Sequence, residues 1–101
     1  MIRFCSLSEL EAKGRVTRWI EEWRDELSAF SLDSEIVVVS TVCPHFGGEL
    51  QREPGTRRLR CKWHSWEFDL DTGSCLTYRV AARLRHYPYA LRDGYLEVSL
   101  P

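Results

Sequence analysis

Two short stretches of the chain each place a cysteine close to a histidine. Residues 43–48 read CPHFGG and residues 61–66 read CKWHSW, so the four side chains follow the pattern C-x-H-x15-C-x2-H. Two thiols and two imidazoles form a complete four-ligand set for a soft metal centre. Because this set is divided between two loops, any fold of the chain has to bring those loops together. The four candidate ligands are Cys43, His45, Cys61 and His64.

The spacing and its flanking residues resemble a small Rieske-type ferredoxin. In a Rieske centre, two cysteines hold one iron of a [2Fe–2S] cluster and two histidines hold the other iron. The resemblance therefore implies that Cys43, His45, Cys61 and His64 bind such a cluster. It covers about the last sixty residues well and the first forty loosely. The flanking residues that share the family pattern are Pro44, Gly47, Gly48, Trp66, Phe68, Asp69, Thr72 and Gly73.

A structural zinc site is the main alternative for the same four ligands. Zinc-binding pairs usually have two to four residues between the ligands and often combine two cysteines. Here the first pair has one intervening residue, and both pairs combine a cysteine with a histidine. The spacing favours the iron–sulfur centre over a zinc module that mediates interactions.

The length and the cysteine content indicate a single domain in a reducing compartment. A chain of 101 residues with 44% hydrophobic residues can build one core. It has no run of eighteen apolar residues and no secretory signal, so we expect neither a membrane span nor export. With two cysteines assigned as ligands, Cys5 and Cys75 remain as plain buried or half-buried thiols, which fits a cytoplasmic location.

The charge is unevenly distributed along the chain. Residues 1–50 have five basic and nine acidic residues, a net charge of −4, and residues 51–101 have nine and six, a net charge of +3. The basic residues near the second loop are either a solvated strand face or a rim that attracts an acidic partner. No part of the chain has the basic, aromatic-rich character of a nucleic-acid-binding surface. The residues concerned are Arg52, Arg57, Arg58, Arg60 and Lys62.

The pattern of apolar residues predicts mostly β-strands. Residues 16–30 fit a helical period as well as short strands, and we predict two strands with a turn near residues 22–25, as the family's opening implies. Residues 8–11 are predicted to form a short turn with a capping box between Ser8 and Glu11. Further strands are predicted at 36–39, 49–51, 57–60, 68–70, 84–89 and 95–100, with turns at 32–35, 53–56, 71–73 and 92–94.

The resemblance implies an all-β fold, a small antiparallel β-sandwich or barrel. Its base would comprise about residues 1–42 and 73–101, and a cluster-binding lobe would comprise about residues 43–72. Two features depart from the family pattern. Ser65 replaces the usual glycine after the second histidine, and residues 74–83 lack the proline of the loop that normally covers the cluster.

The resemblance also predicts the level of the reduction potential. High-potential, quinol-oxidising relatives have a serine two residues after the second histidine and a tyrosine four residues after it. Here Trp66 and Phe68 occupy these positions, and Gly48 and Trp63 occupy those of the disulfide that joins the loops in such relatives. The expected centre is therefore of the low-potential type.

The predicted function is that of a soluble one-electron carrier. The partners implied by the resemblance are a ferredoxin reductase and a terminal oxygenase, and the alternative is a small Rieske subunit of a nitrite reductase. An oxygenase active site of its own would need two more histidines and a carboxylate. Only His86 remains for that purpose, so we do not expect the chain to be an enzyme.

Overall fold

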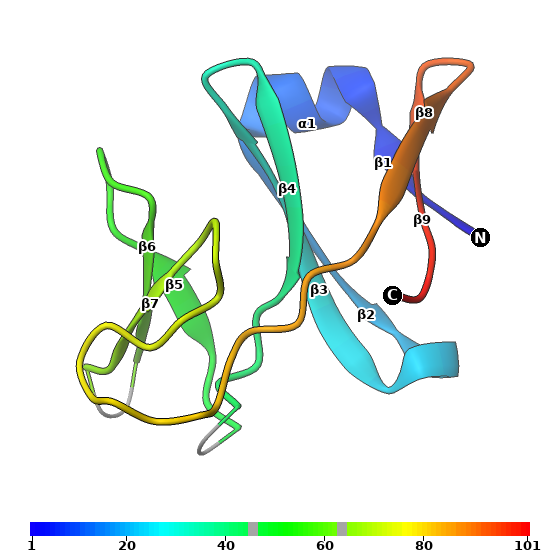
Figure 1. The fold of residues 1–101 in the computed structure, drawn as a ribbon. Coiled ribbons are helices and arrows are strands. Elements are labelled where there is room, and N and C mark those ends of the chain that lie inside the picture. Colours follow the sequence, from blue (N-terminus) through cyan, green and yellow to red (C-terminus); the bar gives the residue numbers. More distant parts are fainter. Residues whose placement is uncertain (45–46, 63–64) are drawn as a thin grey trace. The chain divides into compact units, whose positions relative to one another are not determined.

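A computed structural model describes residues 1–44, 47–62 and 65–101 of the chain (Figure 1). The chain forms two compact units. Unit 1 comprises Met1–Ser40 and His86–Pro101, and unit 2 comprises Thr41–Arg85. All strand pairs within the described ranges are antiparallel, and the strands form three open sheets of three strands each. The predicted all-β antiparallel fold is confirmed, but no sheet in these ranges closes into a barrel.

Unit 1 contains two of the sheets. One has the strand order β1-β9-β8 and the other has the order β2-β3-β4. In the first sheet the two ends of the chain pair directly, with Ile2 opposite Val98. The bounds are Ile2–Ser6 for β1, Tyr95–Val98 for β9, Tyr89–Arg92 for β8, Arg15–Ile20 for β2, Asp25–Leu32 for β3 and Glu35–Ser40 for β4.

The ambiguous stretch after residue 15 forms two strands, as predicted. Strand β2 pairs over its whole length with residues 25–30 of β3, and a short 3-10 helix, η1 (Glu21–Trp23), lies between the two strands. Arg24 closes this turn in the left-handed region at φ 48°. Four consecutive residues of β3 are buried. Because β3 is the central strand of its sheet, its hydrogen bonds to both neighbours outweigh the helical spacing of its apolar residues.

The predicted turn at residues 8–11 is wrong, because helix α1 occupies Leu7–Lys13. The cap lies two residues earlier than predicted, since the Ser6 hydroxyl accepts a hydrogen bond from the Glu9 N–H at 3.1 Å. Gly14 ends the helix in the left-handed conformation at φ 76°. Only one residue of the helix is buried, so the sequence has no apolar period to reveal it.

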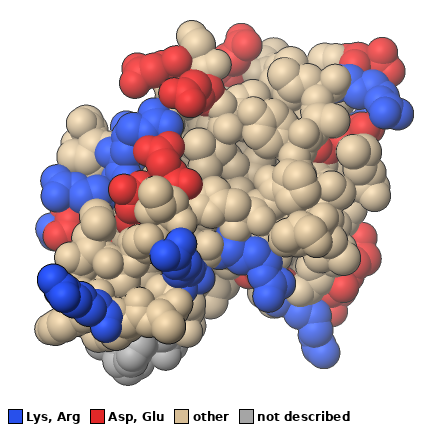
Figure 2. All heavy atoms as spheres, viewed as in Figure 1, with Lys and Arg blue, Asp and Glu red and all other residues tan. Residues whose placement is uncertain are grey.

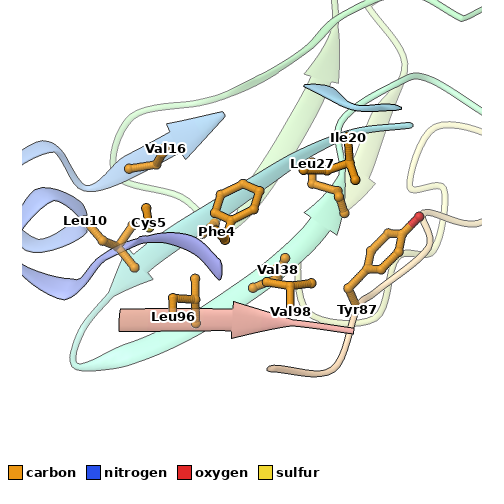
Figure 3. Close-up of a cluster of buried hydrophobic side chains, with 11 residues drawn as sticks. Phe4, Cys5, Leu10, Val16, Ile20, Leu27, Val38, Tyr87, Leu96 and Val98 are labelled. Atoms are coloured by element: carbon orange, nitrogen blue, oxygen red, sulfur yellow. The ribbon is translucent and has the colours of Figure 1, made fainter. Parts of the chain in front are cut away.

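Side chains from both sheets and from α1 form the core of unit 1 (Figure 3). Cys5 lies in this core, where burial and the nearby Glu9 carboxylate raise the pKa of its thiol. Cys75 is half-buried, so both remaining thiols have the burial predicted for them. The core comprises Phe4, Cys5, Leu10, Val16, Ile20, Leu27, Ala29, Val38, Tyr87, Leu96 and Val98.

A carboxylate joins the two points at which the chain leaves and re-enters unit 1. The Asp25 carboxylate accepts one hydrogen bond from the Ser40 hydroxyl and one from the Tyr87 hydroxyl, each at 2.7 Å. The Tyr87 ring stacks on Trp23, with a centroid distance of 5.4 Å and an interplanar angle of 9°. Ser40 and Tyr87 are therefore held together at the edge of unit 1.

The final hairpin begins later than predicted. Residues 84–88 form no strand, and β8 starts at Tyr89. Pro88 has no N–H group, so it cannot extend the ladder towards residue 84. His86 instead makes an isolated bridge to Val39. The predicted turn is present, with Asp93 at φ 52° and Gly94 at φ 79°.

Unit 2 contains the third sheet, with the strand order β5-β6-β7. Its side chains alternate between a buried and an outer face, as a half-buried sheet requires. Leu50 lies opposite Cys61, and Leu59 lies opposite Phe68, and all four side chains are fully buried. The three strands occupy Leu50–Arg52 (β5), Arg58–Cys61 (β6) and Glu67–Asp69 (β7), close to the predicted positions.

Candidate metal centre

The first predicted ligand loop is closed by two backbone hydrogen bonds. The Cys43 N–H donates to the Gly48 carbonyl at 2.7 Å, and the Gly47 N–H donates to the Cys43 carbonyl at 2.8 Å. Gly47 is left-handed, with φ 74°. These bonds bring Gly47 and Gly48 back to the backbone of Cys43.

The second loop repeats this pattern at equivalent positions. The Cys61 N–H donates to the Trp66 carbonyl at 2.8 Å, and the Ser65 N–H donates to the Cys61 carbonyl at 2.9 Å. Ser65 is left-handed, with φ 59°, like the glycine four residues after the first cysteine. The serine that departs from the family pattern thus takes the conformation in which glycine is favoured, at a cost of about 1–2 kcal/mol.

Backbone pairing holds the two loops next to each other. Val42 and Glu49, which flank the first loop, form a bridge across its base. The Glu49 carbonyl also accepts a hydrogen bond at 3.1 Å from the Lys62 N–H in the second loop. The loops therefore meet through their backbones, as the four-ligand hypothesis requires.

The structure places both predicted cysteine ligands inside unit 2. Cys43 is 2% exposed and Cys61 is fully buried. The predicted histidine ligands, His45 and His64, lie outside the described residues, so the complete ligand set remains a prediction. The described residues by themselves contain no group of three or more potential metal ligands. Two buried thiols on paired, equivalent loops nevertheless match the cysteine half of a Rieske ligand set.

The segment after β7 packs along the outer strand of the sheet. Cys75 forms a bridge to Phe68, and the Leu76 N–H donates to the Glu67 carbonyl at 2.7 Å. The centroids of the Tyr78 and Trp66 rings lie 4.7 Å apart, and the rings make an interplanar angle of 50°. This segment lacks the expected proline but is still fixed beside the second loop.

Most of the basic residues near the second loop are paired with carboxylates. Arg57 makes two hydrogen bonds of 2.7 Å to Asp71, and Arg60 forms an ion pair with Glu53. Arg58 lies 3.5 Å from the same Glu53 carboxylate. These contacts support the interpretation as a solvated strand face, because the positive charges are largely neutralised where they lie.

Comparison with known proteins identifies the family. Residues 2–88 match the sequence profile of the Rieske [2Fe-2S] domain, and the chain belongs to this family. The cofactor of this family is a Rieske-type [2Fe–2S] cluster, which accepts and releases single electrons. No curated protein sequence matches the chain.

Several solved structures have the same fold at low sequence identity. The plasma-membrane Rieske protein PetC3 from Synechocystis PCC 6803 has a TM-score of 0.80 and 18% identity, over 98% of this chain and 99% of that chain. The ferredoxin of carbazole 1,9a-dioxygenase from Nocardioides aromaticivorans IC177 has a TM-score of 0.78 and 16% identity, over 99% of this chain and 97% of that chain. A protein from Mycobacterium tuberculosis, described as an NADH-dependent nitrite reductase small subunit, has a TM-score of 0.66 and 22% identity, over 93% of this chain and 88% of that chain.

The similarity to PetC3 concerns the fold. Neither helix of the described residues has the length and apolar character needed to cross a membrane.

Proposed function

We propose that the chain is a one-electron carrier that passes electrons from a ferredoxin reductase to a terminal oxygenase. In this proposal Cys43 and Cys61 would hold one iron of the cluster through their thiolates, and His45 and His64 would hold the other through their imidazoles. The observation that carries the proposal is the pair of equivalent loops, each with a buried thiol at the same position.

The chain contributes burial and rigidity to this function. A carrier works best when its ligands move little between the two redox states. The two hydrogen bonds at each cysteine, together with the pairing between Glu49 and Lys62, hold the backbones of Cys43 and Cys61 in place. Burial of both thiols also keeps water away from them.

Two residues near the second loop support a low-potential centre. Hydrogen bonds to the sulfurs raise the potential of such a cluster, because they stabilise the additional negative charge of the reduced state. Phe68 is fully buried and has no hydroxyl group, and Trp66 replaces the serine of the high-potential relatives. The proposed carrier therefore works at the low end of the Rieske range.

The 101 residues include the proposed ligands of an electron-transfer centre but not those of a mononuclear iron site. His86 is the only histidine left besides the proposed ligands, and it lies in unit 1 beside Val39. One histidine cannot form the site of two histidines and a carboxylate that mononuclear iron oxygenases use.

The free thiols of Cys5 and Cys75 favour a reducing compartment such as the cytoplasm.

A small subunit of a nitrite reductase is the second candidate. It would use the same cluster with a different partner. The similarity to the Mycobacterium tuberculosis protein supports it, and the similarity to the dioxygenase ferredoxin supports the first candidate.

Anaerobic purification followed by analysis of iron and sulfide tests the proposal. We expect two irons and two sulfides per chain, a coloured oxidised protein and an EPR signal after reduction. Cys61→Ser and His64→Ala should each abolish the cluster, whereas the control His86→Ala should retain it. A colourless sample that contains zinc would refute the proposal.

Reconstitution with purified partner systems separates the two candidates. We expect the reduced protein to support substrate oxidation by an aromatic-ring oxygenase that is supplied with its own reductase. Support of nitrite reduction alone would favour the second candidate.

A further inference from the structure

Residues 74–85 contain the entire excess positive charge of unit 2. This segment has three arginines and no acidic residue, whereas residues 41–73 have five basic and five acidic residues. The net charge of unit 2 is therefore +3, and all of it comes from one segment. The arginines are Arg79, Arg83 and Arg85.

These three arginines differ from the arginines of the sheet in their surroundings. All three are exposed, and none has an ion pair among the described residues. Arg57, by contrast, is paired with Asp71, and Arg58 and Arg60 share Glu53. In the view of Figure 2, blue and red spheres lie intermixed on the upper left of the molecule, and further blue spheres lie below them.

The same segment exposes large apolar side chains. Leu76 is 50% exposed, Tyr78 is 54% exposed and Val80 is 39% exposed, although they lie within five consecutive residues. Single exposed apolar residues are common on soluble proteins, but a group bordered by charges marks an interaction surface. Tyrosine and arginine are also enriched where proteins bind one another.

The segment is fixed before any partner binds. The Glu67 N–H donates to the Thr77 hydroxyl at 2.8 Å, and the Leu84 N–H donates to the Gly73 carbonyl at 3.0 Å. The Tyr78 ring rests on Trp66, whose carbonyl accepts the N–H of Cys61. A surface ordered in this way loses little conformational entropy on binding, and it contacts the second ligand loop directly.

We propose that residues 76–85 form the docking surface for an acidic redox partner. The matching face of that protein would have an apolar centre, which covers Leu76, Tyr78 and Val80, and a border of aspartates and glutamates opposite the arginines. The charges would accelerate the encounter, and the apolar contact would hold the complex. This inference deepens the proposed function, because it names the partner chemistry of the same carrier.

Stopped-flow electron transfer from an acidic flavodoxin tests the inference. One electron passes from the flavodoxin hydroquinone, which becomes the semiquinone, to the oxidised protein. The test variant is R79Q/R83Q/R85Q, and the matched control is R57Q/R58Q/R60Q, which loses the same charge from the paired face. EPR and potentiometry on each variant confirm that the centre is unchanged.

We expect the test variant to react about tenfold more slowly at low salt and to lose most of its salt dependence. The control should change less than twofold, and R79Q alone, which replaces the triple variant if that does not fold, should slow the reaction about twofold. Leu76→Ser with Tyr78→Ser should slow the reaction at high salt, where charge is screened. Oxidation of the reduced protein by basic cytochrome c should not slow in the test variant.

Equal slowing by both triple variants would overturn the inference, because only net charge would then matter. No change in the test variant, or none in the apolar variant at high salt, would also overturn it. The proposed function fails in a different way, since a wild-type protein without a cluster would accept no electron and give no EPR signal.

Discussion

Replacement of Asp25 tests whether one carboxylate stabilises the two places where the chain leaves and re-enters unit 1, at Ser40 and Tyr87. Its two oxygens accept hydrogen bonds of 2.7 Å from Ser40 and Tyr87, whose side chains are 8% and 3% exposed. A hydrogen bond to a charged group contributes about 1.5–3 kcal/mol. Because Asp25 itself is only partly buried, we take the lower value for each bond and expect Asp25→Ala to cost about 3 kcal/mol.

Thermal unfolding of the anaerobic protein measures this loss. For a domain of this size, 1 kcal/mol corresponds to a change of about 4–8 °C in Tm, so we expect a decrease of about 12–24 °C. Circular dichroism reports the fold, and visible absorbance reports the cluster separately. The control Glu22→Ala removes an exposed carboxylate from the same turn and should change stability by less than about 0.5 kcal/mol.

A double-mutant cycle isolates one of the two hydrogen bonds. Asp25→Ala and Tyr87→Phe should together cost less than the sum of the single changes, by about 1.5 kcal/mol. Additive effects, or a decrease in Tm of less than about 4 °C for Asp25→Ala, would show that water replaces the carboxylate without loss and would refute the reasoning.

Two further changes test the ligand loops and the potential. Ser65→Gly should raise the stability by about 0.5–1 kcal/mol, because relief of the left-handed strain exceeds the entropy gained by the unfolded chain. Gly47→Ala should lower the stability by about 1 kcal/mol, and only through the backbone conformation, since no described atom lies within 4 Å of an added Cβ. Changes in Tm of the same sign for Ser65→Gly and Gly47→Ala would contradict the equivalence of the two loops. Phe68→Tyr should raise the reduction potential by about 65 mV if the new hydroxyl stabilises the reduced state by about 1.5 kcal/mol. A redox titration in which this potential does not exceed that of the control Phe68→Leu would contradict the hydroxyl explanation.

Much of the candidate centre can be predicted from the chain alone, because its signal is local. Soft ligands at short spacing, with glycine and proline beside them, indicate a metal-binding loop before any fold is known. The turns at 53–56 and 92–94 are equally local, since residues such as Pro54, Gly55 and Gly94 favour particular backbone angles. The family and its antiparallel sheets followed from these signals and are confirmed.

Other features depend on residues that are distant in the chain. The strand at Ile2–Ser6 is not predicted from its own residues, because its pairing partner, Tyr95–Val98, lies at the opposite end of the chain. The left-handed conformation of Ser65 is unexpected for a residue with a side chain, and the hydrogen bonds of its loop impose it.

The distribution of charge shows most clearly which features are local in the sequence and which depend on the tertiary structure. The chain reveals how many arginines follow the second loop, but their effect depends on which carboxylates lie within reach. The sheet brings Glu53 to Arg60 and Asp71 to Arg57, so these two positive charges are neutralised. Arg79 has no carboxylate partner among the described residues, so its positive charge is not neutralised. Local chemistry is encoded in the order of residues, whereas electrostatic effects depend on distances through space, and those are set only when the strands pair.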